Sequence, residues 1–126
     1  MHRLFVAIRP PEDIRDLLLN AMDDGADFRW QSDEQLHLTL RFVGEIERPI
    51  AGDLAAELAR IRSPSFSVHI NGTGRFEQRS SGALWAGVEP REPVAALAAK
   101  VERACIVVGL EPERRAFHPH ITLARW

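Results

Sequence analysis

The sequence has little cysteine and no long apolar run. Cys105 is the only cysteine in 126 residues, so no intramolecular disulfide can form, and the chain suits a reducing compartment or one whose redox state is indifferent to it. It lies on the apolar stripe of an expected helix, which favours a buried packing role over a reactive thiol. The apolar run at residues 3–8 is too short for a signal peptide or a membrane span. We therefore expect a cytoplasmic protein without a membrane segment.

A strong charge of either sign is also absent. The chain has 16 Lys and Arg residues against 18 Asp and Glu residues, which gives a net charge of −2. Any nucleic-acid substrate must therefore be held by a local cluster rather than by a general positive field. The apolar share of 45% and the charged share of 27% are ordinary for a globular domain. The length suits a single domain covering residues 1–126.

Hydrophobic periodicity predicts elements in the order β-α-β-α-β-β-α-β. Strands are expected at 3–8, 36–43, 65–71, 83–88 and 120–125, helices at 11–23, 49–62 and 92–108, and a loop rich in glycine, serine and arginine at 72–82. The segment LFVAIRPPE at 4–12 resembles LWAGVEPRE at 84–92, and each is followed by a helix and then by a His-x-Thr motif. This repeat indicates two β-α-β halves rather than a repeat array.

The His-x-Thr motif occurs as HLTL at 37–40 and as HITL at 120–123. Alternate residues of a strand share a face, so His37 points with Thr39, and His120 points with Thr122. The apolar residues between them are expected to anchor each strand in the core. A pseudo-twofold arrangement of the halves brings two imidazoles and two hydroxyls around one cleft.

A phosphodiester fits this set of side chains. The threonine hydroxyls donate hydrogen bonds to non-bridging oxygens, one neutral histidine accepts a proton from the nucleophile, and one protonated histidine donates a proton to the leaving oxygen. Histidine suits both roles because its ordinary pKa lies near neutrality. Neither motif carries a carboxylate beside its histidine, so we expect neither a metal nor another cofactor.

These motifs and their flanks resemble the two-histidine phosphoesterases, and among them the RNA 2',3'-cyclic phosphodiesterases, also called 2'-5' RNA ligases. The similarity runs through RLFVAI at 3–8, LHLTLRFVGE at 36–45, GRFE at 74–77, LWAGV at 84–88 and ERRAFHPHITLAR at 113–125. It implies a bilobal α+β fold in which two pseudo-symmetric β-α-β halves, with antiparallel sheets, flank a central cleft.

Members of the family usually continue for several tens of residues beyond the second motif, so the resemblance implies a C-terminally shortened version of this fold. Such a chain is a truncated form, a fragment, or a minimal version that covers an exposed sheet edge by forming a homo-oligomer.

The resemblance also implies an activity, the hydrolysis of a 2',3'-cyclic phosphate to a 2'-phosphate. RNA ends or cyclic nucleotides are the implied substrates, with His37 as the acid, His120 as the base, and Thr39 and Thr122 holding phosphate oxygens. The residues themselves do not decide which histidine is the acid. Two other interpretations stay open: a catalytically weak phosphate- or nucleotide-binding module on the same cleft, and a histidine metal-binding protein.

Three further residues are candidates for substrate binding. Strand alternation puts Arg41 on the face of His37, where it is expected to contact phosphate or the RNA backbone. His118 lies in a charged loop before the second motif. Arg125 matches an arginine of the family pattern, although regular alternation puts it opposite His120, and a bulge or a structural salt bridge would reconcile the two. The other rings are assigned to the core (Trp30, Trp85), to capping of the core in preference to base stacking (Phe76), or to no role (His2, His69).

Overall fold

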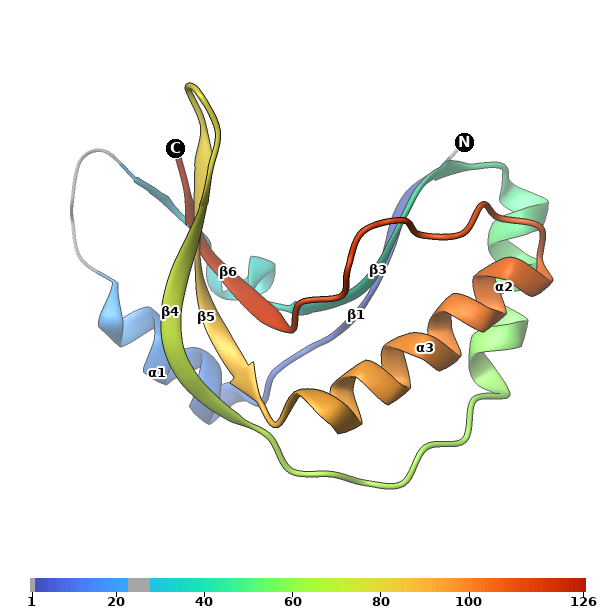
Figure 1. Cartoon of the computed structure of the whole chain (residues 1–126), viewed down its shortest axis with the longest axis horizontal. Helices are drawn as coiled ribbons and strands as arrows, with labels where there is room; N and C mark the ends of the chain where they lie inside the picture. Colours follow the sequence, from blue (N-terminus) through green and yellow to red (C-terminus); the bar gives the residue numbers. More distant parts are fainter. Residues whose placement is uncertain (1, 23–27) are drawn as a thin grey trace.

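An antiparallel sheet with the strand order β1-β3-β6-β5-β4 forms the frame of the molecule, and the short β2 pairs with β6. The computed structural model describes residues 2–22 and 28–126 (Figure 1). The strands are β1 (His2–Ile8), β2 (Arg29–Trp30), β3 (Leu38–Ile46), β4 (His69–Glu77), β5 (Gly82–Glu89) and β6 (His120–Arg125). The helices are α1 (Glu12–Ala21), α2 (Arg48–Ala59) and α3 (Arg91–Val107), with a 3-10 turn at Asp33–Gln35.

The expected order of elements is confirmed, and the helices end within three residues of their predicted bounds. Residue 23, the predicted end of the first helix, lies outside the described residues. The short β2 and the 3-10 turn were not predicted, because two or three residues are too few to show a hydrophobic period.

The predicted loop at 72–82 is wrong over its first half, because β4 continues to Glu77 and pairs with β5. Glycine disfavours a strand by its entropy, but here it makes room for a large neighbour. A Cβ atom at Gly74 would lie 2.3 Å from the ring of Trp85, so only glycine fits beside this indole. The backbone hydrogen bonds of the β4–β5 ladder thus outweigh the loop-like composition of the segment.

The two halves of the sheet meet where β3 pairs with β6. The only residue pair of this junction is Leu38 with Ile121, whereas β1 pairs with β3 and β5 pairs with β4 and β6 over long ladders. Figure 1 shows the result, an arm of β1 and β3 on the right and an arm of β4, β5 and β6 on the left. Helix α3 follows the left arm in sequence but contacts β3 of the right arm. The halves are therefore interlocked rather than merely adjacent.

The apolar residues of both His-x-Thr motifs lie in the core. Leu38, Leu40, Ile121 and Leu123 are all buried, as expected for anchors of the two motif strands. Cys105 on α3 is fully buried among them, which confirms its predicted packing role. Core packing consequently fixes the backbones of the two motifs on the face opposite to the histidines.

Strand β3 contains a β-bulge immediately after its motif. Thr39 pairs with Ala7 and Arg41 pairs with Val6, so Leu40 is an extra residue in this strand. A bulge changes the face to which the following side chains point. Regular alternation therefore stops at Leu40.

The bulge overturns two expectations about the faces of β3. Arg41 does not share a face with His37 and Thr39, because it is buried at 8% exposure on the core side. Phe42, which alternation assigned to the core, is instead 50% exposed.

Strand β6 contains the matching bulge. Thr122 pairs with Trp85 and Ala124 pairs with Leu84, so Leu123 is the extra residue. Leu40 and Leu123 occupy the same position in their motifs. The bulge at Leu123 shifts the alternation of β6, so that Arg125 lies on the same face as His120. A bulge was one of the two explanations considered for this arginine.

The ladders also correct the repeat inferred from LFVAIRPPE and LWAGVEPRE. Ala7 pairs with the threonine of the first motif and Trp85 pairs with that of the second, so Trp85 is the structural counterpart of Ala7. The sequence alignment would match Ala7 with Gly87, which is two residues away. The two halves have equivalent strand pairing. The alignment of their sequences, however, is shifted by two residues from the structural correspondence in the first strand of each half.

Candidate active site at the β3–β6 junction

The two motif histidines lie at the junction of the sheet halves. His37 precedes Leu38 and His120 precedes Ile121, and these two apolar residues form the pair that joins the antiparallel strands. His37 and His120 are therefore diagonal neighbours, with a backbone separation of roughly 7–8 Å for this type of pair. Because Leu38 and Ile121 point into the core, both histidines belong to the opposite face.

Each histidine is held by the same local hydrogen bond. Nδ1 of His37 lies 2.7 Å from the carbonyl oxygen of Gln35, and Nδ1 of His120 lies 2.6 Å from that of His118. A carbonyl oxygen only accepts, so in both rings Nδ1 carries the hydrogen and donates it. The Nε2 atoms are left for proton transfer. Both imidazoles thus have a fixed tautomer and a fixed orientation.

The pKa of His120 is lowered from its ordinary value. Burial of the ring is the main cause, and the positive charges of His118, Arg125 and His37 add to the effect, while the bond to the His118 carbonyl opposes it. His120 is therefore mainly neutral at pH 7, with a lone pair on Nε2.

Aromatic rings pack against both histidines. Phe5 on β1 stacks on His37 with ring centroids 4.6 Å apart and planes 22° apart. Phe76 on β4 and Trp85 on β5 lie 5.3 Å and 5.9 Å from His120. Phe5 was not predicted to be a site residue, and Trp85 was expected in the core. Only the pairing register, which brings each ring beside a motif strand, would have indicated their place.

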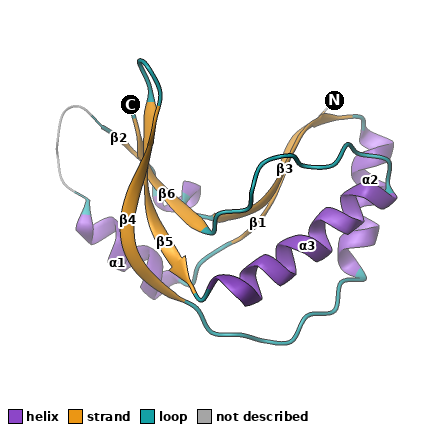
Figure 2. Ribbon diagram, in the orientation of Figure 1, coloured by secondary structure: helices purple, strands orange, loops and turns teal. Residues whose placement is uncertain are grey.

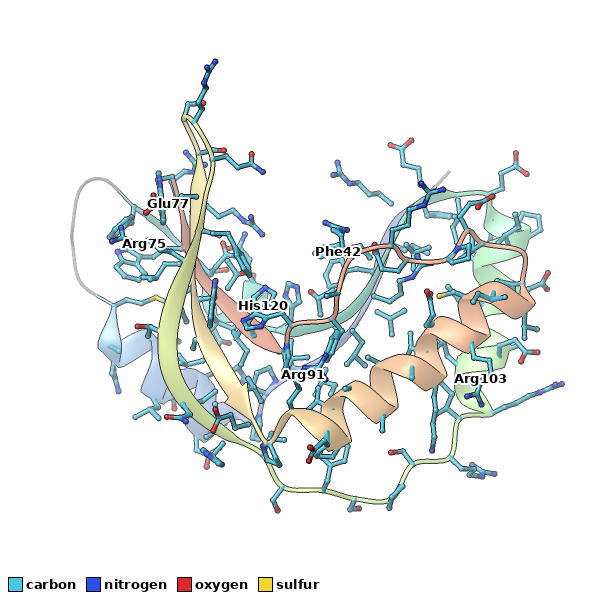
Figure 3. All side chains as sticks on the ribbon, in the orientation of Figure 1. Phe42, Arg75, Glu77, Arg91, Arg103 and His120 are labelled. Carbon is cyan, nitrogen blue, oxygen red and sulfur yellow. The ribbon has the colours of Figure 1, made fainter. Side chains whose placement is uncertain are left out.

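Two open hollows contain rings that pack against the motif histidines. One is lined by residues of β1 and β3 and the loop before β6, and the other by residues of β4 and β5, the first residue of α3 and the end of the loop before β6. Phe5 belongs to the first hollow, and Trp85 and His118 belong to the second. Figure 3 shows His120 between the two arms, with Phe42 on one arm and Arg75 on the other. Each hollow thus contains at least one ring that packs against a motif histidine.

The remaining predicted site residues divide into two groups. Thr39 and Thr122 are partly exposed and alternate with the buried anchors, so they belong to the face of the histidines. His118 lies 5.4 Å from His120, measured between ring centroids, and Arg125 is exposed and near enough to act on the pKa of His120. The structure therefore brings these four residues to the site.

Arg41 does not belong to this group, and its expected contact with phosphate is not supported. Its Nε atom donates to Oε1 of Glu102 at 2.8 Å, its Nη1 atom donates to the carbonyl oxygen of Phe42 at 2.7 Å, and its Nη2 atom donates to that of Glu111. The guanidinium is buried, and it makes all three of these hydrogen bonds. Its role is structural.

Within residues 2–22 and 28–126, no group of three or more His, Cys, Asp or Glu side chains is arranged to hold a metal ion. No helix in these two ranges has the length and apolar character needed to cross a bilayer.

A family model described as the 2'-5' RNA ligase superfamily matches residues 5–126. The chain belongs to this superfamily. Among its curated relatives, the RNA 2',3'-cyclic phosphodiesterase of Aeropyrum pernix is 36% identical over 103 residues, which cover 80% of the chain and 58% of the relative. The protein of the same name from Thermus thermophilus is 37% identical over 138 residues, covering 98% and 68%.

Solved structures of the superfamily agree with the fold. The crystal structure of Escherichia coli LigT complexed with 3'-AMP matches with a TM-score of 0.80 and 31% identity, covering 97% of the chain and 71% of LigT. The resemblance and the α+β fold expected from the sequence are thus confirmed. The chain spans between about three fifths and two thirds of the length of the curated relatives above.

Proposed function

We propose that this chain hydrolyses 2',3'-cyclic phosphates to 2'-phosphates, acting on RNA ends or on cyclic nucleotides. The observation that carries this proposal is the matched pair His37 and His120, two diagonal neighbours whose Nδ1 atoms are both committed to backbone carbonyls. Two imidazoles with free Nε2 atoms on one face supply a proton acceptor and a proton donor to a single reacting group. Curated relatives from four organisms bear the name RNA 2',3'-cyclic phosphodiesterase, which supports the same activity.

The lowered pKa of His120 favours this residue as the general base. Its neutral Nε2 atom takes a proton from a water molecule as the water oxygen bonds to phosphorus. The bond between phosphorus and the 3' oxygen breaks, and this oxygen takes a proton from Nε2 of a protonated His37. The products are a 2'-phosphate and a free 3' hydroxyl, so one water molecule is consumed. The histidines then exchange one proton each with solvent.

The threonines and the positive side chains have a supporting role in this proposal. Hydroxyl hydrogens of Thr39 and Thr122 are donated to non-bridging oxygens, where negative charge grows in the transition state. Arg125 adds positive charge near the same group, consistent with its lowering effect on the pKa of His120. No step in this scheme is assigned to a metal ion.

Turnover of adenosine 2',3'-cyclic phosphate, with and without EDTA, tests the proposal. We expect adenosine 2'-phosphate as the product, identified by phosphorus NMR, at a rate that EDTA leaves unchanged. Adenosine 3'-phosphate would contradict the direction of ring opening. Loss of turnover in EDTA would support the metal-binding alternative, and saturable binding of the nucleotide without any turnover would support the binding module.

Three further proposals concern the domain organisation, the location and the oligomeric state of the protein. The chain acts as a single domain in the cytoplasm, and it forms a homo-oligomer through a sheet edge. Strands β1 and β4 are the two edges of the sheet. The ion pair of Arg75 with Glu77 on β4 is of the kind that discourages edge pairing, which makes β1 the better candidate edge. Light scattering on wild-type protein tests the oligomer.

A further inference from the structure

The carbonyl groups that hold the two motif histidines lie outside the ladders of the sheet. Gln35, whose carbonyl oxygen is bonded to His37, is the last residue of the 3-10 turn. His118, whose carbonyl oxygen is bonded to His120, lies in the loop before β6. The orientation of these two peptide groups therefore depends on the contacts of the peptide groups beside them.

In the first half, one guanidinium binds the carbonyls on both sides of the Gln35 carbonyl. Nη1 of Arg9 lies 2.9 Å from the carbonyl oxygen of Glu34 and 3.1 Å from that of Leu36. The same Nη1 atom lies 2.7 Å from the carbonyl oxygen of Asp33, and Nη2 lies 3.3 Å from Oδ2 of that residue. The peptide groups before and after that of Gln35 are thus held by Arg9, and the Gln35 carbonyl stays directed at the imidazole.

The second half holds its peptide group in the same way, with two partners instead of one. Nη2 of Arg91 donates to the carbonyl oxygen of Phe117 at 3.1 Å, and the backbone N–H of Val88 donates to that of Pro119 at 3.3 Å. Phe117 and Pro119 are the two neighbours of His118 in the chain. The carbonyls on both sides of the His118 carbonyl are therefore fixed.

The two arginines have equivalent places in the fold. Arg9 directly follows β1, and Arg91 begins α3 shortly after the end of β5. Strands β1 and β5 are antiparallel neighbours of the motif strands, so their C-terminal ends lie beside the residues that precede each motif. Each arginine binds the carbonyl three residues before its histidine. Figure 3 shows Arg91 below His120 in that view. The same contact thus occurs in both halves, although the segments before the motifs differ in sequence.

We propose that Arg9 and Arg91 are positioning residues, which fix the tautomers of His37 and His120 by holding the peptide groups in front of them. The catalytic consequence rests on the proposed function. A neutral imidazole accepts a proton at Nε2 only when its own hydrogen is on Nδ1. Rotation of the carbonyl bonded to His120 would therefore leave part of the protein without a base. Rotation of the carbonyl bonded to His37 would free that ring to turn its Nε2–H away from the leaving oxygen.

Nitrogen NMR of isotopically labelled histidine rings tests the inference without any substrate. In wild-type protein, Nδ1 of both neutral rings should carry the hydrogen. Arg9→Met should increase the Nε2–H tautomer of His37 and leave His120 unchanged. Arg91→Met should have the reverse selectivity and a smaller effect, because Val88 still binds the carbonyl on the other side.

Turnover of adenosine 2',3'-cyclic phosphate provides the second measurement. Arg9→Met and Arg91→Met should each lower kcat by roughly threefold to tenfold, the effect of losing one ordinary hydrogen bond, and leave KM unchanged. Arg91 also lines the second hollow. A raised KM in Arg91→Met with a wild-type tautomer at His120 would show that this arginine contacts the substrate, and would overturn its positioning role.

Arg15→Met is the matched control for Arg9→Met. Arg15 also pairs with Asp33, 2.8 Å between Nε and Oδ1, but its Nη1 atom donates to the carbonyl of Pro10 instead of the carbonyls beside Gln35. This variant should lose a comparable ion pair and keep the wild-type tautomers and kcat. An equal change of the His37 tautomer in Arg15→Met would overturn the inference, because the effect would then come from general loosening of the turn.

Wild-type tautomers in folded Arg9→Met and Arg91→Met would also overturn the inference. If Arg9→Met did not fold, Arg91→Met would still decide, because Arg91 is exposed and has a single carbonyl partner. An Nε2–H tautomer of either motif histidine in the wild-type protein would contradict the inference without any variant. Absence of turnover by wild-type protein, with the expected tautomer changes in the variants, would instead refute the proposed function alone.

Discussion

Arg41 and Glu102 form an ion pair, 2.8 Å between Nε and Oε1, that joins the strand of the first motif to helix α3. The other carboxylate oxygen of Glu102 accepts the backbone N–H of Glu113, and Arg41 also binds the carbonyl of Glu111. The connection between α3 and β6, drawn as a loop in Figure 2, is therefore tied to β3 before it enters the second motif. One buried guanidinium thus links both motifs.

Replacing Arg41 with Met should mainly lower stability. The variant loses the three hydrogen bonds of the guanidinium and leaves Oε1 of Glu102 without its cation. We expect a cost of about 1–3 kcal/mol of unfolding free energy, because Glu102 is partly exposed to solvent and keeps its bond from Glu113. Urea denaturation measures this cost. A large rise in KM for the cyclic nucleotide with unchanged stability would show instead that Arg41 contacts the substrate. Glu102→Gln, which keeps the shape of the partner, should lose less stability than Arg41→Met.

Replacing Gly74 with Ala should displace Trp85 from the histidines. The new methyl group would overlap the indole, and strain of this kind costs roughly 1–3 kcal/mol. Since Trp85 lies 4.5 Å from His118 and 5.9 Å from His120 between ring centroids, we also expect a lower kcat.

Gly52→Ala is the matched control for Gly74→Ala. It adds the same methyl group in helix α2, where nothing lies within 4 Å of it. This change should raise stability by about 0.5–1 kcal/mol through helix propensity and leave kcat unaltered. Equal melting temperatures of the two variants would contradict the packing proposed for Trp85.

The pH dependence of kcat/KM should show an acid limb below the ordinary histidine pKa. His120 must be neutral to act as a base, and its pKa is lowered by burial, so activity persists as the pH falls below about 6.5. Protonation is easier in the unfolded chain, so the contribution of His120 to stability is present above this pH and is lost as the pH falls through the lowered pKa. An acid limb centred above pH 7 would contradict the assignment of His120 as the base.

The thiol of Cys105 should be unreactive in the native protein. Burial raises its pKa, so little thiolate forms at neutral pH, and the side chain is fully covered. We expect alkylation by iodoacetamide only after denaturation in guanidinium chloride. Rapid modification at pH 8 with retained structure would show that the core around α3 opens readily.

The regular elements of this fold were predictable because their apolar residues keep a single period. The leucines at 38 and 40 and the helical stripe that contains Cys105 are buried as expected. The bulges were not predictable in the same way, since an extra residue such as Leu40 is as apolar as its neighbours and changes only the face to which the next side chains point. This is why Arg41 was expected on the wrong face and Phe42 was expected in the core.

The centre of the site was more predictable than its walls. His37 and His120 stand out because a four-residue pattern occurs twice, and the local bonds to Gln35 and His118 repeat in the same way. Phe5 and the other aromatic residues beside the histidines come from neighbouring strands, so their place depends on the register of long-range pairing. Local sequence patterns carry no information on that register.

The most direct test of the paired-histidine mechanism is the turnover of adenosine 2',3'-cyclic phosphate by His37→Ala and His120→Ala. Each variant should fold as wild type and lose at least roughly 10²-fold in kcat/KM, while the double variant should lose much less than the product of the two factors. His69→Ala removes an exposed histidine on β4 and should retain full activity. Near-normal turnover by either folded motif variant would contradict the pairing of His37 with His120 as acid and base.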